Sequence, residues 1–283
     1  MPSRTLSSLS LVLLAVAAAC NAGPAPRDPS TVPDVPIRNT AAVVENTHAV
    51  TEVNDTPASL AVVAETDRDP RDRALDARYQ GADLLTFLDV RPGMRVAELT
   101  AGGGYLTELL SRTVGASGQV FANEPPSLVA RTTVSSALRE RLSRSVNTPV
   151  TRVDRELASP LPARARNLDL VYLALPYRTV EALGVRTSEM NRAAFEALAP
   201  GGAYVVLDFR PRMNGPSAVN LHALHAQEST NVRRQVEAAG FVFVTEGRFL
   251  RNDANPNEWD AILASNPTPL EEQDRFLLEF VRP

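Results

Sequence analysis

The stretch "RVAELTAGGGYLTELL", Arg95–Leu110, decides the fold class. Its first apolar run, Arg95–Leu99, predicts a buried strand, and its second run has apolar residues at helical spacing from Tyr105 onward. Three consecutive glycines, Gly102–Gly104, join the two runs and predict a tight turn whose backbone approaches a neighbour closely. Such a turn either cradles a nucleotide-like cofactor or serves strand–helix packing alone.

The alternation of strands and helices continues along the chain. Near-continuous apolar strands separated by helices are typical of a parallel sheet covered on both faces. After a helix ending at Gly240, two closing strands follow, one of which we expect to be antiparallel. The sequence therefore predicts an α/β fold with a doubly wound, mostly parallel seven-stranded sheet. Further strands are expected at residues 119–123, 150–153 and 168–175, with helices at 105–114, 126–142 and 188–198.

Composition excludes several kinds of chemistry. The 283 residues include 29 basic and 33 acidic side chains, and every basic one is arginine. A Schiff-base lysine and a lysine-bearing phosphate loop are therefore excluded. The formal net charge of −4 gives no indication of nucleic-acid binding. Cys20 is the only cysteine, which excludes an internal disulfide and a cysteine nucleophile in the folded body.

The N-terminal residues predict export. An apolar run from Leu6 to Ala19 is too short for a membrane span and has the shape of a signal-peptide core. Ala17–Cys20 resembles a bacterial lipoprotein signal, in which the cysteine is lipidated. We therefore expect residues 1–20 to be a lipoprotein signal peptide and Cys20 to carry a lipid anchor at the cell envelope. A plain secretory signal or an uncleaved anchor is the alternative.

Residues 21–64 differ from the rest of the chain in composition. They are rich in Pro and Ala, and prolines recur too densely for a helix or a central strand. This segment is predicted to be a disordered tether. Residues 65–283 form the expected folded domain.

Two cofactor classes compete for the glycine turn. A dinucleotide fingerprint requires G-x-G-x-x-G, but Thr107 stands at the third glycine position after Gly102 and Gly104. An S-adenosylmethionine site places one acidic residue at the end of the first strand and another after the second. Glu98 and Glu124 stand at those positions.

Four stretches in this order resemble class I S-adenosylmethionine-dependent methyltransferases, and more narrowly a bacterial exported or lipoprotein group of predicted methyltransferases. The resemblance covers residues 67 to 283 and implies a Rossmann-like methyltransferase fold. The stretches are "VAELTAGGGYLTELL", "GQVFANE", "MNRAAFEALAPGGAYVVLDF", and "VRRQVEAAGFVFV" followed by "DRFLLEFVRP".

The resemblance implies a set of cofactor-binding residues. Glu98 would orient the methionine amino group, and Gly102 and Gly104 would border the cofactor. Glu124 would accept hydrogen bonds from the ribose hydroxyls, because a carboxylate takes both at once, and Asp154 would lie near the adenine.

Each of these assignments has a plainer alternative. Thr100 replaces the first glycine of the family's turn, and its side chain would narrow the cleft. The glycines would otherwise serve packing, and Glu124 would be a solvated loop acid. Asp154 would pair with Arg152 or Arg155 on the surface.

Candidate catalytic residues follow the fourth and fifth predicted strands. Pro176-Tyr177 resembles half of the [DNS]-P-P-[YF] motif of amino-methylating enzymes, but Ala174 replaces the polar first residue, so N-methylation is not supported. Tyr177 would line an acceptor pocket or simply pack. Asp208 would act as a base or cap the next loop.

His222 and His225 lie three residues apart, on one face if that segment is helical. His225 is a candidate base, whereas two histidines alone are a weak indication of a metal site, so no metal is expected.

The sequence thus predicts an enzyme that transfers a methyl group from S-adenosylmethionine to an unidentified small-molecule acceptor. The alternative is a non-catalytic, methyltransferase-like binding protein at the cell envelope, because the methyl donor is made in the cytoplasm. A nicotinamide oxidoreductase is the third possibility, and Thr107 argues against it.

Overall fold

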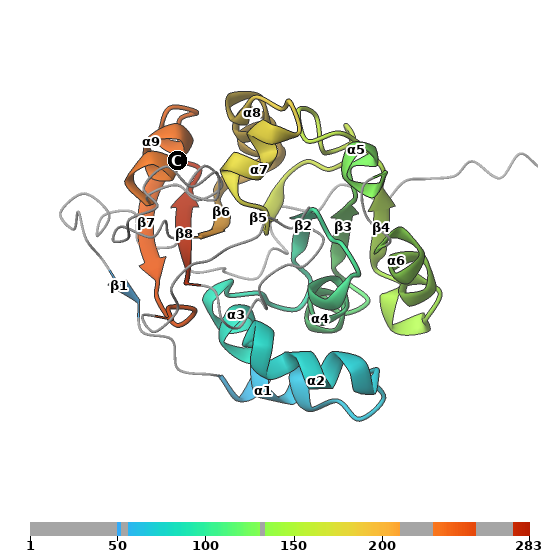
Figure 1. Ribbon diagram of the computed structural model, residues 1–283. Helices are drawn as coiled ribbons and strands as arrows, with labels where there is room; N and C mark the ends of the chain where they lie inside the picture. Colours follow the sequence, from blue (N-terminus) through green and yellow to red (C-terminus); the bar gives the residue numbers. More distant parts are fainter. Residues whose placement is uncertain (1–49, 52–55, 131–133, 210–228, 253–273) are drawn as a thin grey trace, which may run out of the picture. The chain divides into compact units, whose positions relative to one another are not determined.

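The computed structural model describes residues 50–51, 56–130, 134–209, 229–252 and 274–283. Contacts divide the chain into two units, Met1–Ile37 and Arg38–Pro283, and all described residues lie in the second. They form an eight-stranded sheet in the order β1-β7-β8-β6-β5-β2-β3-β4 (Figure 1). The strands are β1 (Val50–Thr51), β2 (Arg95–Leu99), β3 (Gln119–Asn123), β4 (Val150–Val153), β5 (Leu168–Leu173), β6 (Leu198–Phe209), β7 (Val242–Gly247) and β8 (Arg275–Val281).

The sheet is parallel except at β8, which pairs antiparallel with β6 and β7. The chain fills one side of β2 with β3 and β4 and then crosses to β5 on the other side, so the strand order reverses at β2. In open α/β sheets, ligands bind outside the carboxyl ends of the strands at this point. The predicted doubly wound, mostly parallel seven-stranded sheet is confirmed, and β1 adds a two-residue edge strand.

Helices cover both faces of the sheet. In Figure 1, α7, α8 and α9 lie on one side of the strands, and α1 to α4 lie on the other. The helices are α1 (Pro57–Ala64), α2 (Pro70–Tyr79), α3 (Gly81–Phe87), α4 (Tyr105–Val114), α5 (Pro126–Val129), α6 (Val134–Leu142), the 3-10 helix η2 (Ser145–Asn147), α7 (Tyr177–Ala182), α8 (Thr187–Ala197) and α9 (Ser229–Glu237).

The alternation of side chains along the strands decides which residues face the functional edge. Glu98 of β2 pairs with Tyr172 of β5, and both point toward the face covered by α3 and α4. The side chain of Asp208 points to the same face of β6 as those of Tyr204 and Val206, which belong to the core under α7 and α8. Asp208 therefore points to the opposite face from Glu98.

The folded unit begins earlier than the sequence predicts. The expected tether extends to residue 64, yet Pro57–Ala64 forms α1, with Pro57 at its start and Thr56 as its N-cap. Thr56 Oγ1 accepts the Ser59 N–H at 3.1 Å, and Ser59 Oγ lies 2.8 Å from Thr86 Oγ1 of α3. This polar anchoring of a proline-initiated helix is why the predicted boundary is wrong.

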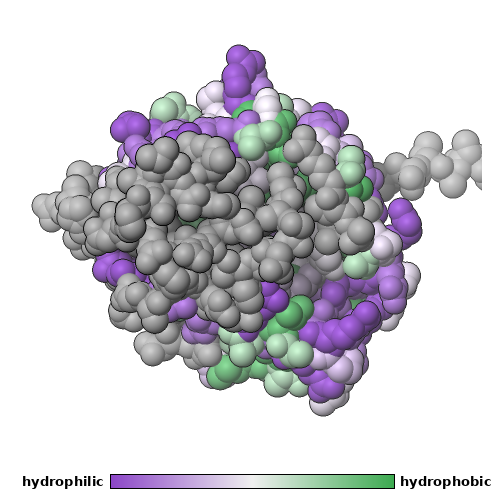
Figure 2. Space-filling model, viewed as in Figure 1, coloured by the Kyte–Doolittle hydropathy of each residue, from purple (hydrophilic) through white to green (hydrophobic). Residues whose placement is uncertain are grey.

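Apolar side chains of the described chain are concentrated in its interior. Figure 2 shows hydrophilic residues around much of the visible described surface, with hydrophobic residues in small groups. Among the described residues, the exposed large hydrophobic side chains are Leu60, at 49%, and Val242, at 38%. Within the same residues, every helix is too short or too polar to cross a membrane.

Candidate functional site

A cavity of about 760 Å³ lies at the carboxyl ends of β2 and β5. Its base includes Glu98, the turn Thr100–Gly103 and Tyr172. Cavities of roughly 300–1,000 Å³ hold ligands of cofactor size. Its polar wall comes from α2 and from the end of α6 and the residues after it. Its apolar wall includes Leu75, Tyr79, Leu84, Leu106, Leu207 and Phe209.

The glycine turn presents backbone to this cavity. A Cβ added at Gly102 or Gly103 would meet nothing within 4 Å, so both positions face open space. The helix that follows, α4, begins without a side-chain cap, and no hydrogen bond within the described chain uses the N–H of Gly102 or Gly103. These N–H groups are available to a ligand, and the start of a helix favours a negatively charged one.

Gly104 has a different role from the one expected. Its φ of +79° is left-handed, and a Cβ there would lie 2.7 Å from Leu138 Cδ1 and 2.9 Å from Arg141 Cδ. Gly104 therefore allows α6 to pack against the turn. The cavity is bordered by Gly102 and Gly103, whereas Gly104 lies outside its lining.

Thr100 adopts the backbone conformation that glycine favours. Its φ is +69°, which is strained for a β-branched residue. Its hydroxyl donates a hydrogen bond to the Leu99 carbonyl, and its side chain is part of the cavity's lining. The backbone thus keeps the geometry of a glycine turn while threonine narrows the cavity beside it.

Glu98 is a buried carboxylate at the base of the cavity, only 3% exposed. Thr107 Oγ1 donates to Glu98 Oε2 at 2.5 Å. Burial raises the pKa of Glu98 to about 7, against the lowering effects of the Thr107 hydrogen bond and the positive charge of Arg141. A cationic ligand group in the cavity would favour the ionised carboxylate.

Tyr172 lies beside Glu98 on the neighbouring strand. Burial raises the pKa of its hydroxyl well above the usual value, and the charge of Glu98 raises it further. Tyr172 is therefore a phenol at all ordinary pH values and offers the cavity a hydrogen-bond donor.

The two carboxylates after β3 and β4 share one arginine. Buried Glu124 has its Oε2 3.0 Å from Arg152 Nη2, and exposed Asp154 has its Oδ1 2.7 Å from Arg152 Nε. Neither carboxylate is part of the cavity's lining. The pairing of Asp154 with Arg152 is the surface alternative that the sequence left open.

Asp208 and Tyr177 lie together on the far face of the sheet. The N–H of Tyr177 donates to Asp208 Oδ2 at 3.1 Å, so Asp208 accepts a hydrogen bond from a backbone N–H at the start of α7, where helices leave such groups without a partner in the helix. Burial raises the pKa of Asp208 to about 8. The Tyr177 ring is in the core, and its hydroxyl donates to Asn191 Oδ1 at 2.8 Å. Neither side chain is part of the cavity's lining: strand alternation directs Asp208 away from it, and Tyr177 begins α7 on the opposite face of the sheet.

Other predicted functional residues lie outside the described residues. These are Cys20, His222 and His225.

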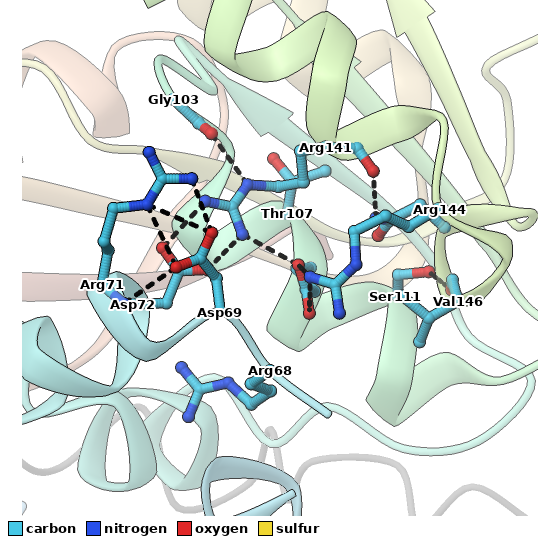
Figure 3. A network of polar contacts seen from close by, with 12 residues as sticks. Arg68, Asp69, Arg71, Asp72, Gly103, Thr107, Ser111, Arg141, Arg144 and Val146 are labelled. Carbon is cyan, nitrogen blue, oxygen red and sulfur yellow. Dashed lines mark hydrogen bonds and ion pairs between the residues drawn. The ribbon is translucent and has the colours of Figure 1, made fainter. Parts of the chain in front are cut away.

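A network of arginines and carboxylates forms the polar wall (Figure 3). Arg141 contacts Asp72 of α2, the Gly103 carbonyl and Glu108 of α4, and Arg144 also contacts Glu108. The sequence does not predict this network, because charged residues on amphipathic helices are ordinarily solvated. The sequence feature that hints at the network is Glu108, a charged residue among the apolar residues of α4, where it is buried.

Comparisons with known proteins agree with this architecture. The family model of protein-L-isoaspartate(D-aspartate) O-methyltransferase matches residues 68–151. The ubiquinone/menaquinone biosynthesis C-methyltransferase of Burkholderia multivorans is 30% identical over 129 residues, which are 45% of this chain and 48% of that protein. The corresponding protein of Burkholderia vietnamiensis is 31% identical over the same shares. The chain thus spans about half the length of these curated relatives.

Solved structures extend the likeness over most of the chain. A methyltransferase from Aquifex aeolicus has a TM-score of 0.52 at 15% identity, covering 76% of this chain and 94% of that one. An arsenic(III) S-adenosylmethionine methyltransferase from Chlamydomonas reinhardtii has a TM-score of 0.51 at 14% identity, covering 80% and 73%. The fold of this chain is therefore that of class I S-adenosylmethionine-dependent methyltransferases.

Proposed function

We propose that this protein is an S-adenosylmethionine-dependent methyltransferase with a small-molecule acceptor. One observation carries the proposal: the cavity lies at the point where the strand order reverses, and it brings together the open glycine turn and the buried carboxylate of Glu98. The local sequence likeness to methyltransferases covers the same turn, within residues 68–151.

The residues present fit the cofactor. The N–H groups of Gly102 and Gly103 would hold the methionine carboxylate, and Glu98 would face the cationic amino group. When bound, S-adenosylmethionine supplies an electrophilic methyl group on a sulfonium. The apolar wall would keep water away from the reacting atoms and would hold the acceptor in line with the methyl group.

Glu124 would accept the ribose hydroxyls after Arg152 moves away from it, and Asp154 would then lie near the adenine. His225 stays our candidate for the base that removes a proton from the acceptor. Replacement of His225 by Gln would then abolish turnover and leave cofactor binding intact. Loss of binding instead would argue that His225 acts on the cofactor or on the fold.

The acceptor class is inferred from the cavity wall. Leucine and aromatic side chains form much of it, which favours an acceptor with an apolar body. The relatives that are 30–31% identical are named as C-methyltransferases of quinone biosynthesis, a likeness that supports a small acceptor.

Incubation of the full chain with methyl-labelled S-adenosylmethionine and a bacterial small-molecule extract tests the activity. Label recovered in a low-molecular-weight product is the expected result. Binding of S-adenosylmethionine without any label transfer would favour the alternative of a non-catalytic binding protein. Failure to bind S-adenosylmethionine or S-adenosylhomocysteine would overturn the proposal.

We also propose that the protein is exported and anchored to the cell envelope through a lipid on Cys20. The support is the sequence Leu6–Cys20. Cell fractionation of the wild type and of Cys20→Ala tests it, with loss of membrane association expected for the variant. Unchanged association would contradict lipidation.

A further inference from the structure

Arg141 lies where three structural elements meet at the edge of the cavity (Figure 3). Its Nη2 donates to Asp72 Oδ1 of α2 at 2.8 Å, and its Nη1 donates to Glu108 Oε2 of α4 at 2.8 Å. Its Nε donates to the Gly103 carbonyl at 2.9 Å. Its Nη1 also donates to Asp72 Oδ2, so all three guanidinium nitrogens are used and together they join α2, α4 and the glycine turn, which a lysine ammonium could not reproduce.

The contact with Gly103 fixes the orientation of the glycine turn. The peptide between Gly103 and Gly104 is held on one side by the bond from the Gly104 N–H to the Ala101 carbonyl, at 2.9 Å. Arg141 holds its carbonyl on the other side. A peptide with glycines on both sides would otherwise rotate easily. The Gly103 N–H belongs to the preceding peptide, so Arg141 acts on it by restraining Gly103 itself through the Gly103 carbonyl.

Arg141 also acts on Glu98 through its charge. It is the positively charged group that lowers the pKa of Glu98, against the larger effect of burial. The Thr107 hydroxyl of α4 and the Tyr172 phenol of β5 also lie beside Glu98, and both are neutral. Arg275 of β8 lines the same cavity and acts on Tyr172 through its charge.

We propose that Arg141 is a positioning residue of the cofactor site, which restrains Gly103 of the glycine turn through its carbonyl and places a positive charge close to Glu98. This inference rests on the proposed function, because it assigns a role toward the same cofactor. Arg141 itself touches the turn and the two helices, and it acts on the ligand through Gly103 and Glu98.

Calorimetric titration of the full chain with S-adenosylhomocysteine, from pH 5.5 to 8.5, tests this role. The test variant is Arg141→Gln, and the matched control is Arg112→Gln. Arg112 shares Glu108 as a partner, at 2.8 Å, and is equally part of the network, but it lies outside the cavity's lining. A purely structural effect would therefore appear in both variants.

The expected loss for Arg141→Gln is at least tenfold in affinity, because one charge-assisted bond that orders the turn is removed. The pH above which binding strengthens should also move upward, since Glu98 loses a neighbouring positive charge. Arg112→Gln should stay within about twofold of the wild type, with an unchanged pH profile, since it leaves Gly103 and Glu98 untouched. Should Arg141→Gln not fold, Arg141→Lys keeps the charge and is expected to bind several-fold more weakly with the wild-type pH profile.

Equal affinity and pH profile in Arg141→Gln and the wild type would overturn the inference alone. An equal loss in Arg112→Gln would also overturn it, since that result indicates general loosening of the network. Absence of binding by the wild type would overturn the proposed function, and this inference with it.

Discussion

Replacement of Glu98 by Gln should remove a pH-dependent destabilisation of the ligand-free protein. The buried carboxyl has a pKa of about 7 in the folded chain, against an ordinary value of 4.5. Between these values the folded protein holds a proton that the unfolded chain has released. Stability therefore falls as the pH rises from 4.5 to 7, and it levels off above 7.

The size of the effect follows from the two pKa values. Each tenfold change in proton affinity is worth about 1.4 kcal/mol, so the full cost of ionising Glu98 in the folded state is about 3 kcal/mol. About 2–3 kcal/mol of this falls between about pH 5 and pH 8. The amide introduced by Glu98→Gln would keep an acceptor for Thr107 but would never ionise, so the variant lacks this part of the pH dependence.

Urea unfolding of both proteins at pH 5 and pH 8 measures the difference. Ionisation of Asp208 also destabilises the folded protein in this range, since burial raises its pKa to about 8. Asp208 is present in both proteins, so its contribution cancels in the difference between them. Glu196→Gln, an exposed position on α8, is the control and should follow the wild type. Equal pH dependence in Glu98→Gln and the wild type would refute the argument that Glu98 is a desolvated carboxylate.

Four further substitutions test individual features of the site. Thr100→Gly should stabilise the chain by about 1 kcal/mol, since the left-handed φ of +69° is strained for threonine; an unchanged urea midpoint would contradict this. Gly104→Ala should lower the free energy of unfolding by about 1–3 kcal/mol or more, because the added methyl group overpacks the contact with α6. Gly103→Ala, at a position that faces open space, should keep a free energy of unfolding within about 0.5 kcal/mol of the wild type. Arg152→Gln should strengthen binding of S-adenosylhomocysteine by releasing Glu124 for the ribose, and weaker binding would show that Arg152 itself helps to hold the ligand.

The sequence predicts the strands well where apolar runs end in strong breakers. The limits Arg95–Leu99, Gln119–Asn123 and Val150–Val153 are those expected, as is the helix Tyr105–Val114. Glycines and prolines stand at or close to the ends of most of these segments, so the hydrophobic periodicity of each strand or helix ends abruptly. Their order in the sheet then follows from the rules for parallel α/β folds.

The boundary at residue 64 fails for a local reason. Helix α1 has no clear apolar face, and its position depends on the Thr56 cap and on a contact to Thr86. Caps within a proline-rich segment give only a weak signal beside the composition of the segment as a whole.

Side-chain pairing explains why the site was predicted only in part. Glu98 and Gly102 both line the cavity. Their positions could be predicted because the alternation of side chains along a strand and the place of a glycine turn can be read from the sequence. The pairing of Glu124 with Arg152 depends on the register between β3 and β4, which one sequence does not specify. The contact of Arg141 with Gly103 joins residues 38 positions apart, through packing of α6 that no local motif predicts.

We infer above all that the cavity beside the glycine turn binds S-adenosylmethionine. Titration of the full chain with S-adenosylhomocysteine at neutral pH, beside the variant Gly103→Val, tests it most directly, because a Cβ at Gly103 would point into open space. We expect saturable one-to-one binding by the wild type and its loss in a variant that remains folded. Absence of binding by the wild type, or equal binding by Gly103→Val, would contradict it.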